Sequence, residues 1–268
     1  MTTTSLQVAI ITGGTSGIGL AVGRQLTEQP NWRVYLIGTN EQRGHDTVKD
    51  LPRASFCKAN VGDYDSIASV FQEIFEQNAR IDFVFANAGV TGLAFNIYES
   101  LPTGVIPPKP NLDAVDINFA GVVWTAYLAL HYFRQSPRND HSQRNLIITG
   151  SCTSLYRAGS VPVYAGTKHA LIGFARSIAR RFHQDGIRVN IIAPGIVKTN
   201  FGNEQLWEKT PPDVIIPMKH ILDVTLSLLS GEDMVDSQGR QVSGPELFGR
   251  VVEITVNDYY QRAAGMDR

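Results

Sequence analysis

A tyrosine and a lysine stand four residues apart in a segment of helical spacing, as Tyr164 and Lys168. At this spacing the phenol and the ammonium share one face of a helix. A cation beside a phenol stabilises the phenolate and lowers its pKa toward the working pH, which suits a general acid or base. Because most isolated pairs of this kind are surface pairs, the assignment depends on the motifs around it.

The second element is a glycine-rich turn, Thr12-Gly-Gly-Thr-Ser-Gly-Ile-Gly19, between an apolar run and an amphipathic segment. Its glycines permit a tight turn and let a diphosphate approach the backbone, where the N–H groups of a helix N-terminus bind the anion. The spacing is neither the G-x-G-x-x-G fingerprint nor a Walker loop, since no Gly-Lys-Ser/Thr follows. For this motif alone, a merely tight strand–helix turn remains the alternative.

Three more motifs follow predicted strands directly: Asn87-Ala88-Gly89, Gly150-Ser151 and Pro194-Gly195. In open parallel sheets, ligands bind at the carboxyl ends of the strands. We therefore expect all of these motifs to meet at one edge of a sheet.

The period of the apolar residues predicts the elements that position these motifs. Short apolar runs predict buried strands at 8–12, 34–37, 54–59, 81–86, 145–149, 187–193 and 250–256. Helical spacing predicts helices at 18–29, 42–51, 63–77, 112–134, 164–184 and around 224–229, and the Gly/Pro-rich stretch 91–111 predicts a long irregular segment. The alternation predicts an α/β fold, a Rossmann-type doubly wound parallel sheet with helices on both faces, in one domain over 1–268.

Composition narrows the class of protein. The chain has 268 residues, 43% of them hydrophobic and 18% charged, which is typical of a folded globular protein. With 24 basic and 25 acidic residues, no net field attracts nucleic acid or a membrane, and we expect neither as a partner. Two distant cysteines and scattered histidines give no metal-ligand spacing, so we expect no metal. The chain shows no secretory signal, and we expect a cytoplasmic protein.

Together the motifs resemble the short-chain dehydrogenase/reductase family, in its single-domain branch of about 250 residues. The resemblance runs from about residue 6 to about residue 256, and its motifs keep the family's order. They are the turn Thr12–Gly19, Ala86-Asn87-Ala88-Gly89, Asn118 in Asp-Ile-Asn-Phe, Ser151 thirteen residues before Tyr164, Lys168, and Arg188–Gly195 followed by Thr199.

The resemblance implies hydride transfer between a nicotinamide cofactor and a carbonyl/alcohol pair. Tyr164 would be the general acid/base, and Lys168 would lower its pKa and bind the nicotinamide ribose. Ser151 would hydrogen-bond the substrate oxygen, and Asn118 would hold a water in a proton relay. Cofactor binding is further implied for Gly13, Thr15, Ser16, Gly17, Ile18, Gly19, Thr39, Asn40, Asn60, Val61, Asn87, Ala88, Gly89, Pro194, Gly195, Val197 and Thr199.

Three positions depart from the family pattern. Ala86 replaces an asparagine, where we expect an effect on packing, and Asn60 replaces an aspartate near the adenine, where an amide oxygen can still accept. After the second strand, Gly38 stands where NAD-preferring relatives often carry an acidic residue. Thr39 and Ser16 stand where NADP-preferring relatives often carry a basic one. Neither kind of residue is present, and Arg43 is the nearest basic residue. Because a 2′-phosphate without a cation is costly to dehydrate, we lean to NAD, and NADP stays open.

Two segments are expected to shape the substrate pocket. One is the segment 156–162, which begins at Tyr156, with Ser151 and Thr153 as further pocket residues just before it. The other is a mobile lid at about 196–217 with Phe201, Leu206 and Trp207. The apolar lining favours a lipophilic or polycyclic secondary alcohol or ketone of the kind found in secondary metabolism. The C-terminal end resembles the 15-hydroxyprostaglandin dehydrogenase-like members. Family resemblance also implies a homodimer or homotetramer.

A reading from another class is a non-redox protein of the same fold, which binds a dinucleotide or metabolite as a sensor, scaffold or non-redox catalyst. A sensor has no need of all four groups Asn118, Ser151, Tyr164 and Lys168. Since all four are present, the sequence favours the oxidoreductase.

Overall fold

One eight-stranded sheet organises the computed structural model, which describes residues 6–92, 96–137, 144–202 and 204–262. Its strand order is β10-β9-β6-β5-β4-β1-β2-β3. The strands are β1 Gln7–Thr12, β2 Trp32–Gly38, β3 Ala54–Lys58, β4 Phe83–Ala86, β5 Arg144–Thr149, β6 Ile187–Pro194, β9 Val251–Ile254 and β10 Tyr259–Arg262. A separate small sheet pairs β7 Met234–Val235 with β8 Gln241–Val242.

Every pairing in the large sheet is parallel except the last, in which β10 runs antiparallel to β9. The predicted doubly wound Rossmann-type sheet is therefore confirmed, with one antiparallel strand added at its edge. The sequence did not predict β10, because its four residues, Tyr-Tyr-Gln-Arg, lack an apolar run.

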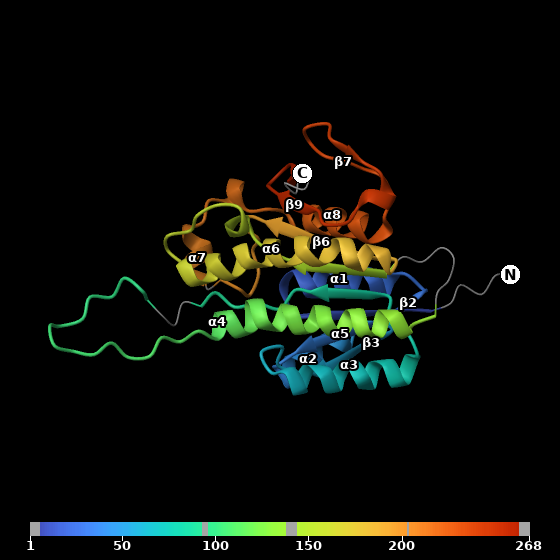
Figure 1. Ribbon diagram of the computed structural model, residues 1–268, viewed down its shortest axis with the longest axis horizontal. Helices are drawn as coiled ribbons and strands as arrows, with labels where there is room; N and C mark the ends of the chain where they lie inside the picture. Colours follow the sequence, from blue (N-terminus) through green and yellow to red (C-terminus); the bar gives the residue numbers. More distant parts are fainter. Residues whose placement is uncertain (1–5, 93–95, 138–143, 203, 263–268) are drawn as a thin grey trace.

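Helices cover both faces of the sheet (Figure 1). On one face, α3 (Tyr64–Asn78), α5 (Gly121–Gln135) and α6 (Pro162–Gln184) pack in a row, and on the other α1 (Gly17–Glu28) packs beside α8 (Met218–Ser230). Helix α2 (Glu41–Val48) lies against β2 and β3. Successive strand residues alternate between two apolar cores: in β1, Val8 and Ile10 join one, and Ala9 and Ile11 the other. Burial on both faces explains the continuous apolar runs in the sequence.

The predicted helix 112–134 is built from three pieces. A short α4 (Asp113–Val115) leads into a π-helical turn (Asp116–Ala120) and then into α5. Such turns often occur at functional sites, and this one contains the predicted Asn118. Gly121 follows it, where a Cβ would come within 2.8 Å of the carbonyl oxygen of Val61.

The C-terminal third differs most from the prediction. The helix expected around 224–229 extends over the whole of α8, and a short helix, α7 (Glu204–Lys209), was not predicted. Short 3-10 turns at Cys152–Ser154, Pro212–Val214 and Gly244–Glu246 were missed as well. Turns of three residues are too short to show a period in the sequence.

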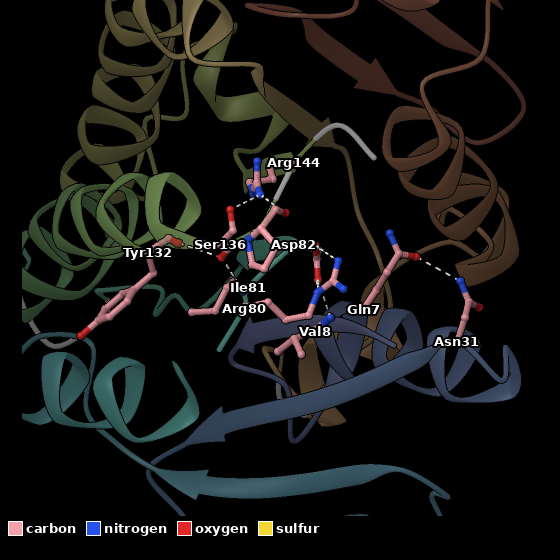
Figure 2. A network of polar contacts seen from close by, with 10 residues as sticks. Gln7, Val8, Asn31, Arg80, Ile81, Asp82, Tyr132, Ser136 and Arg144 are labelled. Carbon is pink, nitrogen blue, oxygen red and sulfur yellow. Dashed lines mark hydrogen bonds and ion pairs between the residues drawn. The ribbon is translucent and has the colours of Figure 1, made fainter. Parts of the chain in front are cut away.

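A polar network ties together the amino ends of the strands (Figure 2). Arg80 donates to both carboxylate oxygens of Asp82, at 2.8 and 2.7 Å, and the Val8 N–H donates to the same carboxylate at 2.8 Å. Nearby, the Ile81 N–H donates to the Ser136 hydroxyl at 2.8 Å. This edge lies opposite the predicted site.

The irregular segment predicted at 91–111 is confirmed for its described part. All residues from 96 to 113 are exposed, and the segment 96–112 projects from the body and leads into α4 (Figure 1). Its exposed side chains include Ile97, Tyr98, Val105 and Ile106. Among the described residues, no helix is both long and apolar enough to span a membrane.

Candidate active site

The glycine turn between β1 and α1 has the geometry that its composition predicts. Gly13 and Gly17 have φ of +63° and +54°, in the left-handed region that favours glycine. A Cβ at Gly13 would lie 2.9 Å from the Ala88 Cα, and one at Gly17 would lie 3.2 Å from the Thr199 Cβ. The turn thus brings together three predicted cofactor segments, which follow β1, β4 and β6.

The N-terminus of α1 fits an anion. Ser16 occupies the N-cap position, but its side chain caps no backbone N–H, and the first turn carries no acidic residue. The first N–H groups of a helix need partners, and a phosphate satisfies them while also interacting favourably with the helix dipole. The residues present therefore fit the diphosphate of a dinucleotide, with Gly17, Ile18 and Gly19 presenting their N–H groups.

Hydrogen bonds join the ends of three strands next to this turn. The Thr12 hydroxyl accepts from the N–H groups of Asn87 and Ala88 at 3.0 and 3.1 Å. The Asn87 amide donates to the Thr12 carbonyl at 3.2 Å and accepts from the Thr149 hydroxyl at 3.0 Å. Asn87 therefore fixes the spacing between β1, β4 and β5 at the edge where the motifs meet.

Lys168 is a buried cation beside this network. The residue is 3% exposed, and its ammonium donates to the Thr149 carbonyl at 2.8 Å. Burial lowers the pKa of Lys168 to about 8, because the charged form loses its hydration. Within the described residues it has no carboxylate partner.

Asn118 is fully buried in the π-helical turn. Its side chain accepts from the Val90 N–H at 2.8 Å, and donates to the Val90 carbonyl at 2.9 Å and to the Thr167 hydroxyl at 3.3 Å. A Cβ on Gly89 would lie 3.2 Å from Asn118 Oδ1 and 3.7 Å from Lys168 Nζ. Asn118 thus anchors the irregular segment at Val90, directly after the Asn-Ala-Gly motif, and its predicted water-holding role stays a prediction.

Tyr164 and Ser151 meet as the sequence predicted. Burial raises the pKa of the Tyr164 phenol, and a hydrogen bond with Ser151 opposes that shift. The Lys168 ammonium lies 5.7 Å from the centre of the Tyr164 ring. The predicted lowering of the phenol pKa by Lys168 is not found in this structure, since the ammonium turns toward Thr149 and desolvation dominates at the phenol.

Ser151 caps a short turn that carries the substrate side of the site. Its hydroxyl accepts from the Thr153 N–H at 3.1 Å, and its own N–H donates to the Ser154 hydroxyl at 3.1 Å. Thr153 was predicted to line the pocket, and its hydroxyl is buried with no hydrogen-bond partner among the described residues. The two reciprocal bonds form a capping box and hold Ser151 in place.

The segment 196–217 starts at the same edge. A β-bridge between Ile196 and Ile215 closes its ends, and the Phe201 ring lies 5.9 Å from the Tyr164 ring. Leu206 is 50% exposed, and the indole N–H of Trp207 donates to the Gly202 carbonyl at 3.1 Å. Phe201 thus lies beside Tyr164, the predicted acid/base, whereas the hydrogen bond of the Trp207 nitrogen stays within the segment 196–217.

The structure gives two predicted site residues other partners. Asn40 caps α2, accepting from the Arg43 N–H at 2.8 Å. The Tyr156 hydroxyl donates to the Glu253 carboxylate at 3.1 Å, so its polar end faces β9. Asparagine often caps helices, and tyrosine hydroxyls often form hydrogen bonds. Which partner each side chain has here depends on the tertiary structure.

Asn60 and Val61 lie at the end of β3, as predicted. The Asn60 amide oxygen accepts from the Gly62 N–H at 3.0 Å, and Val61 is buried against Gly121. Thr15, which is 4% exposed, lies beside Gly38, where a Cβ would come within 2.9 Å of the Thr15 hydroxyl. A carboxylate at position 38 would therefore require Thr15 to move.

Sequence reasoning missed three residues that hold the site together: Thr149, Thr167 and Val90. Thr149 supplies both the carbonyl for Lys168 and the hydroxyl for Asn87. Its place as the last residue of a predicted strand was the available signal. Val90 and Thr167 hold Asn118 through hydrogen bonds that the spacing of residues in the sequence does not predict.

Known proteins match both the sequence and the geometry. The sequence model for the short chain dehydrogenase family matches residues 7–209. The chain is 41% identical to the short-chain dehydrogenase/reductase prx7 of Penicillium rubens over 258 residues, which cover 91% of this chain and 90% of that protein. The chain belongs to the short-chain dehydrogenase/reductase family. It is therefore an NAD(P)-dependent oxidoreductase.

Other members of the family extend the comparison. The short-chain dehydrogenase/reductase prx6 of the same fungus is 36% identical over 82% of this chain and 77% of its own length. The solved complex of Pseudomonas aeruginosa RhlG with NADP has a TM-score of 0.74 at 20% identity, covering 95% of this chain and 97% of that one. The second likeness shows the family's Rossmann-type fold.

Proposed function

We propose that this short-chain dehydrogenase/reductase transfers a hydride between a nicotinamide cofactor and a lipophilic secondary alcohol or ketone. The observation that carries the proposal is the buried Lys168 ammonium, which uses one donor on Thr149 and lies beside the Tyr164 phenol. An ammonium has three donors. The remaining donors suit the ribose hydroxyls of a nicotinamide nucleotide.

The residues of the site divide the chemistry between them. A bound nicotinamide supplies or accepts the hydride. Tyr164 gives its proton to the carbonyl oxygen during reduction and takes it back during oxidation, while Ser151 donates a hydrogen bond to the same oxygen. Lys168 holds the ribose through its ammonium. Burial lowers the pKa of this group to about 8, so it loses its proton more readily than an exposed lysine does.

The proposed substrate is lipophilic because the segment beside Tyr164 presents apolar side chains. Phe201 and Leu206 are 46% and 50% exposed. Solvent exposure of large apolar groups next to a site is typical of a surface that a ligand covers. We propose that the segment 196–217 closes over the substrate and buries these side chains.

We propose NAD as the preferred cofactor. The hollow beside Asn40, lined by Asn40, Gln42, Arg43, Asp46 and Thr47, contains one cation and one anion. A 2′-phosphate placed near Arg43 would therefore also meet the Asp46 carboxylate, whereas a ribose hydroxyl would not be repelled.

A fluorescence titration with NADH and with NADPH tests the cofactor, followed by turnover of secondary alcohols that range from polar to polycyclic. We expect NADH to bind more tightly and turnover to rise with the apolar area of the alcohol. Tighter binding of NADPH that disappears in Arg43→Gln would reverse the cofactor assignment. Binding of neither nucleotide would contradict the proposed reaction.

A further inference from the structure

Three side chains from distant parts of the sequence form a cluster beside the substrate edge: Tyr156, Glu253 and Arg262. Glu253 lies on β9 and is 5% exposed. Its carboxylate accepts from the Tyr156 hydroxyl at 3.1 Å and from Arg262 Nε at 2.5 Å. A guanidinium nitrogen of Arg262 also lies 3.4 Å from the Tyr156 oxygen.

The cluster has a rigid base. Glu253 is paired across the sheet with Ala193 of β6 on one side and with Tyr260 of β10 on the other. Arg262, the last residue of β10, also lies 4.9 Å from the Tyr260 ring centre. A buried carboxylate is costly unless it is paired and hydrogen-bonded, so this geometry is held strongly.

A short turn connects the cluster to Ser151. Ser151 caps the turn at one end, as described above, and the Tyr156 N–H donates to the Cys152 carbonyl at 2.9 Å at the other. The Leu155 N–H donates to the same carbonyl at 3.0 Å. Residues 151–156 thus form one hydrogen-bonded unit, with the serine hydroxyl at its start and the anchored phenol at its end.

We propose that Glu253 and Arg262 are positioning residues for Ser151, acting through the hydroxyl of Tyr156 and the turn 151–156. This inference rests on the proposed function, in which Ser151 binds the carbonyl oxygen. The cluster fixes the far end of the turn, and the turn sets where the serine hydroxyl meets the substrate. Two of its members lie beyond residue 209, where the match to the family's sequence model ends.

The first test combines Tyr156→Phe with Ser151→Ala in a double-mutant cycle of kcat/KM. Tyr156→Phe removes one hydroxyl and keeps the ring and the Glu253–Arg262 pair, so the fold is preserved. We expect a loss of about tenfold in kcat/KM, and less than about twofold when Ser151 is already alanine, because residues that act as a unit are not additive. An equal loss in both backgrounds would overturn the proposal.

Arg262→Gln, with Arg262→Lys as the conservative rescue, tests the other end of the cluster. Arg134→Gln is the matched control, since Arg134 forms a similarly exposed ion pair with Asp185 at the end of α5. We expect lower kcat with unchanged NADH affinity for Arg262→Gln, partial recovery for Arg262→Lys, and no change for the control. Loss of thermal stability with full turnover would show a structural role only and contradict positioning.

A readout independent of turnover uses Cys152, which lies within the turn. In a Cys57→Ala background, we expect a thiol reagent to label Cys152 several-fold faster in Tyr156→Phe and Arg262→Gln, because the freed turn opens more often. Unchanged labelling rates would contradict the proposal. If the wild-type protein reduces no carbonyl compound, the proposed function fails, while the labelling rates still decide whether the cluster holds the turn.

Discussion

The buried Asp82 carboxylate at the amino edge of the sheet is paired with a cation, whereas the buried Lys168 ammonium at the carboxyl edge has no carboxylate partner among the described residues. Asp82 accepts from Arg80 and from a backbone N–H, so its carboxylate is matched by a cation. Lys168 is buried to the same degree but is matched within the described residues by a neutral carbonyl. The paired charge stabilises the fold, and the unpaired charge is free to act on a ligand.

The largest expected effect is a loss of activity without a loss of stability, caused by a substitution at the carboxyl edge. Tyr164→Phe should lower kcat/KM by about 10²- to 10⁴-fold, the range for losing a general acid/base. Stability and NADH affinity should change little, because the phenol ring remains. Steady-state kinetics and a nucleotide titration measure this, with Tyr127→Phe as the control on an exposed tyrosine of α5. Full turnover by Tyr164→Phe would remove the proposed role of the phenol.

A substitution at the amino edge, Asp82→Ala, should lower stability without lowering activity. Asp82→Ala leaves Arg80 buried without its partner and should lower the free energy of unfolding by about 3–5 kcal/mol. Activity per folded molecule should stay unchanged. Urea unfolding measures the cost, and Asp223→Ala, which breaks an exposed pair with Lys219, should cost less than about 1 kcal/mol. Equal costs for the two variants would show that the buried network is no stronger than a surface pair.

The Lys168 ammonium predicts a pH dependence of stability that the Asp82–Arg80 pair does not share. Its pKa is lowered from 10.5 to about 8, so between these pH values the unfolded chain binds a proton that the folded chain does not. Stability relative to Lys168→Met should therefore rise with pH across this window, by up to about 3 kcal/mol. Urea unfolding curves recorded about every half pH unit from pH 7 to 10 measure the difference. A constant difference would mean that Lys168 is not desolvated.

The smallest effects compare one hydrogen bond at each edge. Thr149→Val loses the bond to Asn87, and Ser136→Ala loses the bond from the Ile81 N–H. Each should cost about 1–2 kcal/mol of stability. Only Thr149→Val should weaken NADH binding, since Asn87 sets the spacing beside the glycine turn. A similar loss of affinity in Ser136→Ala would break the division between the two edges.

The sequence by itself determined the parallel strands and the glycine turn, and the roles it assigns to Asn118, Ser151, Tyr164 and Lys168 stay predictions. Buried parallel strands need continuous apolar runs, and Tyr164 and Lys168 share a helix face whatever surrounds them. The same local logic failed for β10 and for the short helix α7, whose residues carry no period. The likeness of the C-terminal end to 15-hydroxyprostaglandin dehydrogenase-like members stays a prediction.

Only the tertiary structure decided what the polar side chains bind. Asn40 was predicted to bind the cofactor and caps a helix, and Tyr156 was predicted to line the pocket and anchors on Glu253, 97 positions away. The pKa of Tyr164 depends in the same way on burial, which raises it against the opposing hydrogen bond with Ser151. Hydrogen-bond partners and desolvation depend on which elements the fold brings together, and the spacing of residues along the chain does not contain that information.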